Sequence, residues 1–177
     1  MKDIYTTDKL DVVVDNNVLQ DLYELGCVDL LFLVFESVTI PRSIFDSEML
    51  VAIKDSLDGF DYIVGDIHTP EGFAMFQNLS GKPYRKLSRY DKFGIAMAHE
   101  RSCYCGSNDR LVRRACEVFS ILYTGILGVL GRAFYQKRID RTDFLHYTEK
   151  LKSEETTCYI GNDVIDAFLD SFRPLME

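Results

Sequence analysis

Short apolar runs alternate along the chain with segments whose apolar side chains recur at helical intervals. The first run covers residues 11–15, where three valines stand between two aspartates, and residues 16–26 then show helical spacing that ends at a glycine. A short β-branched run is typical of a buried strand, whereas apolar positions three to four apart indicate an amphipathic helix. The pattern predicts a strand followed by a helix.

The same alternation continues along the rest of the chain. Further strands are predicted at residues 37–41, 62–64, 103–105 and 118–122. Repeated strand–helix units imply right-handed crossovers and a sheet with helices on both faces. We therefore predict the α/β class, with three α/β/α layers around a mainly parallel central sheet. Helices are predicted at residues 27–35, from 42 onward, from 88, and at 111–117, 125–136, 142–152 and 162–172, with a partly helical excursion over 66–86.

Length and composition are those of an ordinary globular domain. The 177 residues suit one compact unit, and neither an internal repeat nor a linker interrupts them. Apolar residues make up 47% and charged residues 27%, which excludes intrinsic disorder as a description of the whole chain. We expect a single domain over residues 1–177.

Net charge restricts how the chain can bind a nucleic acid. The 28 acidic and 20 basic residues give a formal charge of −8, the wrong sign for binding by bulk electrostatics. Contacts to a nucleic acid must therefore be local. An acidic total remains compatible with an enzyme that gathers carboxylates around a divalent metal ion.

Cysteines and the N-terminal sequence indicate the compartment. The five cysteines are odd in number, form no C-x-x-C and mostly have apolar neighbours, which favours reduced thiols over disulfides or a zinc site. The N-terminal residues lack a basic-then-apolar export pattern, and no stretch approaches the roughly 18 uncharged apolar residues of a membrane span. We expect a cytoplasmic protein with no membrane partner.

Four carboxylates are candidates for one site. Asp15 ends the first predicted strand and Asp109 follows the fourth, while Glu48 and Asp91 lie on helices that can lean over the same sheet edge. Ligands of open parallel sheets bind beyond the carboxyl ends of the strands. Crowded carboxylates repel one another, so such a cluster normally implies a bound cation, and oxygen ligands favour Mg²⁺ or Mn²⁺.

Four segments carry a family resemblance, in order. Residues 12–19 (VVVDNNVL) resemble the opening motif of PIN-domain nucleases, residues 87–98 the helix of their third acid, and residues 107–115 the turn and helix of their fourth. Residues 123–130 resemble a glycine-containing segment of the branch that includes VapC-like toxins. The matches span about residues 11–140, and the helices at about 141–173 are compatible with the same PIN-like fold.

The resemblance implies an endoribonuclease that uses one or two divalent ions to direct water at a phosphorus centre in RNA. It implies that Mg²⁺ or Mn²⁺ is held, directly or through water, by Asp15, Glu48, Asp91 and Asp109, which are then the catalytic and metal residues. Asn17 would orient the first carboxylate or the substrate. The VapC-like branch further implies a toxin held inactive by an antitoxin protein, which could place an arginine among the acids, and a homodimer.

Two positions depart from the family pattern. The second acid is either Asp46 or Glu48, and we favour Glu48 because it precedes an apolar residue and follows Phe45 by three. Asn108 stands where some relatives carry a further acid, which would weaken metal binding or shift it toward water-mediated contact.

Several of these residues also have an ordinary structural interpretation. Asp15, Asp91 and Asp109 can each cap a helix N-terminus, which needs no catalytic role. Arg113, one helical turn after Asp109, can pair with that acid or hold a phosphate. A group of cations beside Asp91 can guide an RNA backbone or form a solvated loop; it comprises Lys82, Arg85, Lys86, Arg89 and Lys92, with Tyr84 and Tyr90 between them.

Two other functions compete with the nuclease. A PIN-like scaffold without turnover would serve as a docking module for protein or RNA, which the uncertain second acid and Asn108 leave open. A phosphatase of the haloacid-dehalogenase type would need a second aspartate at position 17, and Asn17 argues against it. The three histidines are scattered and suggest neither a zinc triad nor a Ser–His–Asp arrangement.

Overall fold

A five-stranded sheet lies at the centre of the computed structural model, which describes residues 5–176. The strand order is β3-β2-β1-β4-β5 and every adjacent pair is parallel, which confirms the predicted sheet. Both neighbours of β1 are in register with it, since Val13 aligns with Thr39 on one side and Cys105 on the other. The strands are β1 (Asp11–Val14), β2 (Ser37–Pro41), β3 (Ile63–Gly65), β4 (Tyr104–Gly106) and β5 (Tyr123–Thr124).

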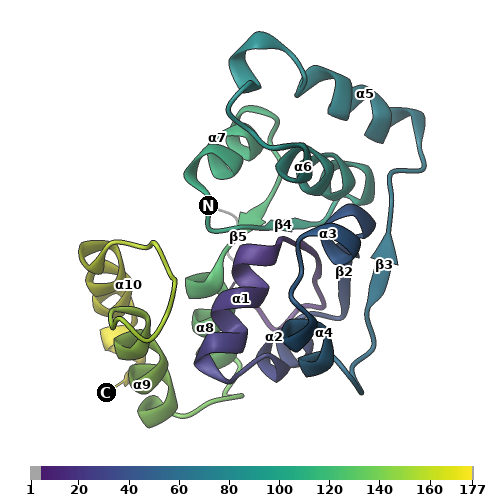
Figure 1. The fold of residues 1–177 in the computed structure, drawn as a ribbon. Helices are drawn as coiled ribbons and strands as arrows, with labels where there is room; N and C mark the ends of the chain where they lie inside the picture. The colour runs from purple at the N-terminus through teal and green to yellow at the C-terminus, as the bar shows by residue number, and fades with distance from the viewer. Residues whose placement is uncertain (1–4, 177) are drawn as a thin grey trace.

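Helices cover both faces of this sheet, as Figure 1 shows. Successive strand residues point to opposite faces, so Val12 and Val14 enter one hydrophobic core and Val13 enters the other. This confirms the three-layer α/β/α prediction. The first core is covered mainly by α1 (Asn16–Leu25), α2 (Asp29–Val34), α4 (Val51–Ser56), α8 (Ile126–Tyr135), α9 (Arg141–Leu151) and α10 (Asn162–Met176), and the second by α5 (Pro70–Asn78), α6 (Arg89–Arg101) and α7 (Arg110–Val118).

The last strand does not lie where the sequence placed it. Residues 118–122 were expected to be extended, but Val118 ends α7 and the following turn carries Ser120 at a φ of 55°. Ile121 donates its backbone N–H to the carbonyl of Cys116, at 2.8 Å, so the apolar run closes the helix. The strand forms afterwards, as β5.

The segment after β2 also differs in detail. The helix expected from residue 42 is two short helices, α3 (Arg42–Ser47) and α4, separated by residues 48–50. This interruption leaves Glu48 at the C-terminal end of α3, with an αR backbone conformation. The excursion over 66–86 is partly helical as predicted, with α5 and a short 3₁₀ turn, η1 (Lys82–Tyr84).

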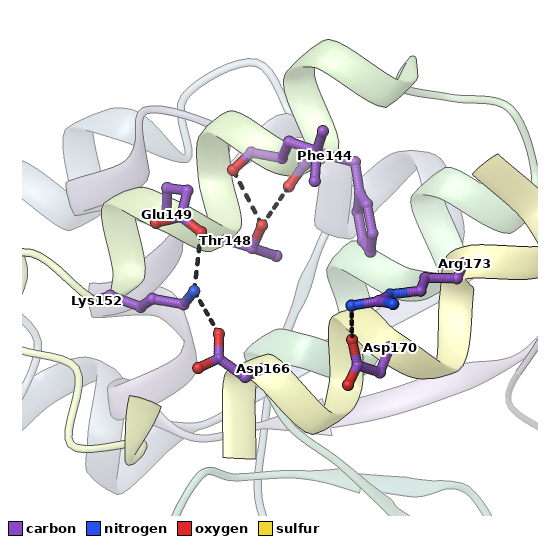
Figure 2. Close-up of polar contacts among 8 residues, drawn as sticks. Phe144, Thr148, Glu149, Lys152, Asp166, Asp170 and Arg173 are labelled. Atoms are coloured by element: carbon purple, nitrogen blue, oxygen red, sulfur yellow. Dashed lines mark hydrogen bonds and ion pairs between the residues drawn. The ribbon is translucent and has the colours of Figure 1, made fainter. Parts of the chain in front are cut away.

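The C-terminal helices pack on α8 through aromatic rings. Phe144 of α9 is fully buried, stacks on Phe134 of α8 at a centroid distance of 4.6 Å, and contacts Phe172 of α10. Lys152 bridges Glu149 of α9 and Asp166 of α10, as Figure 2 shows. The two helices therefore extend the first core. The expected domain of 1–177 includes residues 1–4 and 177, which lie outside the described residues.

Membrane crossing requires a long apolar helix, and none of the helices within residues 5–176 has the necessary length and apolar content.

Candidate functional site

A cavity of about 560 Å³ lies where the carboxyl ends of the strands meet the helices that follow them. Asp15 follows β1 directly, and its backbone N–H donates to the carbonyl of Gly106 at the end of β4. This bond brings the turn after β4, which ends in Asp109, beside the turn after β1. The sequence-predicted residues that line the cavity are Asp15, Asn17, Glu48, Asp91 and Asp109.

The carboxylate of Asp15 is held by three hydrogen bonds. Its Oδ1 accepts the N–H of Asn16 at 2.7 Å, which caps α1. Its Oδ2 accepts Nδ2 of Asn17 at 2.7 Å and Oγ of Ser107 at 3.1 Å. The amide oxygen of Asn17 in turn accepts the N–H of Asn108 at 3.0 Å. Asn17 therefore connects the two turns and fixes the direction in which Asp15 points.

Asp91 and Asp109 both cap helices while lining the cavity. Oδ2 of Asp91 accepts the N–H of Ser88 at 2.7 Å, and the N–H of Asp91 donates to Oγ of Ser88, a capping box at the start of α6. Oδ1 of Asp109 accepts the N–H groups of Leu111 and Val112 at 2.6 and 3.2 Å. Capping and a place in the site are thus compatible, because these bonds engage one carboxylate oxygen of each residue.

The two alternatives for the second acid are placed differently. Glu48 lines the cavity, whereas Asp46, two residues earlier on α3, is not among the lining residues. Partial burial and the negative charge of Asp91 raise the pKa of Glu48. Glu48 is therefore close enough to Asp91, another of the four acids, for the two carboxylates to repel each other.

Burial and mutual repulsion disfavour the ionised carboxylates. Burial is the main cause that raises the pKa of Asp15 to about 7, and the charges of Asp91 and Glu48 raise it further. Burial also raises the pKa of Asp91, and the charge of Asp109 adds to this effect. Within residues 5–176 none of these four acids forms an ion pair with a lysine or arginine. The cavity therefore concentrates negative charge that forms no ion pair with a lysine or arginine among the described residues.

This donor set fits a hard divalent cation in kind and in charge. Carboxylate oxygens are the ligands that Mg²⁺ and Mn²⁺ prefer, and a cation would relieve the repulsion that raises the pKa of Asp15. In the part of the chain that the structure describes, no three Asp, Glu, His or Cys side chains are grouped closely enough to hold an ion as they stand. The acids surround the cavity without converging on one point.

Arg113 binds a backbone carbonyl rather than pairing with Asp109, which was one of its two expected roles. Its Nη2 donates to the carbonyl oxygen of Asn108 at 2.8 Å, and no ion pair with Asp109 is found among the described residues. The reason is geometric: capping turns the Asp109 carboxylate toward the backbone N–H groups of α7. Arg113 therefore supports the turn that carries Asp109.

Sequence reasoning missed two polar side chains in this network. Ser107, 1% exposed, donates to Asp15 and accepts the N–H of Asp109 at 3.2 Å. Asp21, 4% exposed on α1, accepts Nδ2 of Asn108, and burial raises its pKa to about 7. Asn108 also accepts the N–H of Ile126 at 2.9 Å. An asparagine suits this position because a carboxylate at 108 could not donate to Asp21.

The sequence signal for these residues was weak. In the sequence Ser107 is only the first residue of the fourth-acid motif, and Asp21 lies on a helix where an acid is usually exposed. Its near-complete burial on the cavity side of α1 was the only distinguishing feature, and this requires the fold.

The chain matches the model of a known protein family. The family model DUF3368, described as a PIN domain, matches residues 11–173, which is most of the chain. No curated protein and no solved structure gives a significant match.

Proposed function

The chain belongs to the PIN-domain family, and on this premise we propose that it is a divalent-metal-dependent endoribonuclease that hydrolyses phosphodiester bonds in RNA. PIN domains are generally nucleases, commonly ribonucleases, and typically use divalent metal ions. The observation that carries the proposal is the cavity at the carboxyl edge of the sheet. Four carboxylates from separate elements line it: Asp15, Glu48, Asp91 and Asp109.

Each polar side chain has a defined task in this proposal. The four acids would hold Mg²⁺ or Mn²⁺, directly or through water. The ion would supply positive charge that offsets the charge developing on the phosphoryl group and would make water easier to deprotonate. Asn17 and Ser107 donate to Oδ2 of Asp15 and so keep this carboxylate directed at the cavity.

The net charge of −8 does not attract RNA, so contacts to its phosphates would come from cations close to the cavity. Arg110 lines the cavity beside Asp109, where its guanidinium can meet an RNA phosphate. Lys82, Arg85, Lys86 and Arg89 are exposed just before and at the start of α6, whose first turn carries Asp91. None of the four forms an ion pair within residues 5–176, so they are available to the RNA backbone.

Two protein partners belong to the same proposal. One is an antitoxin that would insert an arginine among the unpaired carboxylates and compete with the metal ion, and the other is a second copy of the chain. The acidic cavity supports the first, because an arginine is the side chain that best matches a carboxylate pair. The resemblance of residues 123–130 to the VapC-like branch supports both.

The choice between Glu48 and Asp46 gives a direct test. With Mg²⁺ or Mn²⁺, the wild type should cleave a mixed pool of single-stranded and structured RNA, and EDTA should stop it. Glu48→Gln should lower the cleavage rate about tenfold or more, because it removes a charge that helps to hold the ion. Asp46→Asn, two residues away, should stay within about twofold of the wild type.

Gel analysis of labelled RNA measures both rates, and circular dichroism checks that each variant is folded. Loss of cleavage in Asp46→Asn with full activity in Glu48→Gln would reverse the assignment of the second acid. Absence of cleavage by the wild type with either metal would favour the docking module.

A further inference from the structure

An aromatic side chain stands fully exposed on the rim of the acidic cavity. Tyr159 is 100% exposed, yet it lines the same cavity as Asp15 and Asp91. It belongs to the segment between α9 and α10, far along the chain from the four acids. A large ring left entirely in water beside a polar cavity contributes nothing to the core, so it is available to a ligand that enters the cavity.

Burial alternates along the segment that carries Tyr159. Cys158 and Ile160 are partly buried and pack against the first core, whereas Tyr159 between them faces outward. Both flanking side chains are anchored against the core, and the tyrosine between them is left in solvent. The exposure of this ring is therefore a consequence of how its neighbours pack.

Polar contacts hold the segment against α1. The N–H of Thr157 donates to Oε2 of Glu24 at 2.6 Å, and its Oγ1 donates to Oε1 at 2.9 Å. Cys158 interacts with Asp21 and lowers its pKa, and Asp21 also accepts Nδ2 of Asn108, in the turn after β4. The rim is thus joined to the same network that positions Asp109.

The base of the segment is closed by an ion-pair bridge. Nζ of Lys152 lies 2.8 Å from Oε1 of Glu149 and 2.5 Å from Oδ1 of Asp166, which joins the end of α9 to the start of α10, as Figure 2 shows. Both carboxylates raise the pKa of Lys152. The segment between α9 and α10 is therefore held at two places, by the ion pairs of Lys152 and by the hydrogen bonds of Thr157. Tyr159 follows the second of these places.

We propose that Tyr159 is a substrate-binding residue that stacks on an unpaired base of the RNA at the rim of the cavity that the four carboxylates line. This inference rests on the proposed nuclease function. A base in a duplex already has stacked neighbours on both sides, so an exposed ring of this kind selects a single-stranded stretch.

Charge around Tyr159 favours a base over a phosphate. Residues 153–157 carry Glu154 and Glu155, both exposed, and no cation. Phosphates would be repelled from this side of the cavity and attracted to the cations near α6 and to Arg110. A neutral base is not repelled, and stacking on a tyrosine tolerates any base because every base has a π-face.

Binding can be measured without cleavage, which separates this inference from the proposed function. The probe is a short single-stranded RNA that contains 2-aminopurine, whose fluorescence is quenched by stacking, added to the Asp91→Asn protein. Asparagine at 91 keeps an oxygen that can accept the N–H of Ser88. In this background Tyr159→Ala should raise the dissociation constant about 5- to 150-fold, while Tyr159→Phe and Tyr159→Trp keep both affinity and quenching.

Tyr135→Ala is the matched control, since this tyrosine is 41% exposed and lines a different cavity. In the active protein, Tyr159→Ala should raise KM and leave kcat nearly unchanged. Unchanged affinity in Tyr159→Ala, or a Tyr159→Phe variant as weak as Tyr159→Ala, would overturn the stacking role even if the wild type cleaves RNA. A wild type that cleaves nothing, with affinity still lost in Tyr159→Ala, would overturn the nuclease proposal and support base stacking.

Discussion

Asp15→Asn is expected to lower the rate of RNA cleavage at least about a hundredfold, and also to raise the unfolding temperature of the metal-free protein at pH 8. Activity falls because the substitution removes the charge of the carboxylate that three donors direct into the cavity. Stability rises because this carboxylate is buried near two other acids. The two effects have the same physical cause.

The sign of the stability effect follows from the pKa of Asp15. Folding raises this pKa from 3.8 to about 7, so the folded protein binds the proton more tightly than the unfolded chain. The contribution of Asp15 to stability is therefore fully present below about pH 4 and is lost as pH rises through about 7. A neutral asparagine avoids this loss, so its advantage should be largest at pH 8 and should vanish near pH 4.

Thermal unfolding across this pH range measures the effect, with about 2–4 °C expected for each kcal/mol in a protein of this size. Asparagine cannot accept every bond that Asp15 accepts, which reduces the gain. Asp11→Asn, at the exposed other end of β1, is the control and should change neither activity nor the pH dependence. An unfolding temperature that Asp15→Asn lowers equally at pH 5 and pH 8 would contradict the account of a destabilising buried charge.

Saturating Mn²⁺ is expected to raise the unfolding temperature of the wild type at pH 8 by about 5–10 °C. An ion at a hundred times its dissociation constant stabilises the folded state by about 2.7 kcal/mol, which gives a shift of this size. The shift should shrink toward pH 5, because the ion must then displace a proton from Asp15.

Variants separate a specific site from general binding to an acidic protein. Asp91→Asn should abolish most of the Mn²⁺ shift, whereas Asp46→Asn should retain it, since Asp46 does not line the cavity. EDTA should reverse the shift in the wild type. Equal shifts in the two variants would mean that Mn²⁺ binds elsewhere on the surface.

The fold was predictable where one local pattern has one interpretation. The valine run before Asp15 is a parallel strand because its side chains alternate between two cores, and such a run has no polar face. Residues 118–122 were misassigned because a short apolar run can also close a helix, and only the bond from Ile121 to Cys116 distinguishes the two.

The candidate site was predictable as a set of acids at turns but not as a network. Order along the chain identified Asp15, Asp91 and Asp109, since each follows a strand or begins a helix. Asp21 and Tyr159 could be recognised only from the structure. Asp21 is distinguished by its burial on α1, and Tyr159 by the packing of its two neighbours, which leaves it exposed. Neither the burial of Asp21 nor the exposure of Tyr159 can be predicted from the spacing of apolar residues in the sequence.

Cleavage of one labelled RNA pool by the wild type and by Asp91→Asn, purified in parallel and tested with Mn²⁺ and with EDTA, is the most direct measurement of the central claim. We expect cuts only for the wild type with Mn²⁺, and a folded Asp91→Asn protein that leaves the RNA intact. Equal cleavage by both proteins, or cleavage by the wild type in EDTA, would contradict a nuclease that depends on these carboxylates and a metal ion.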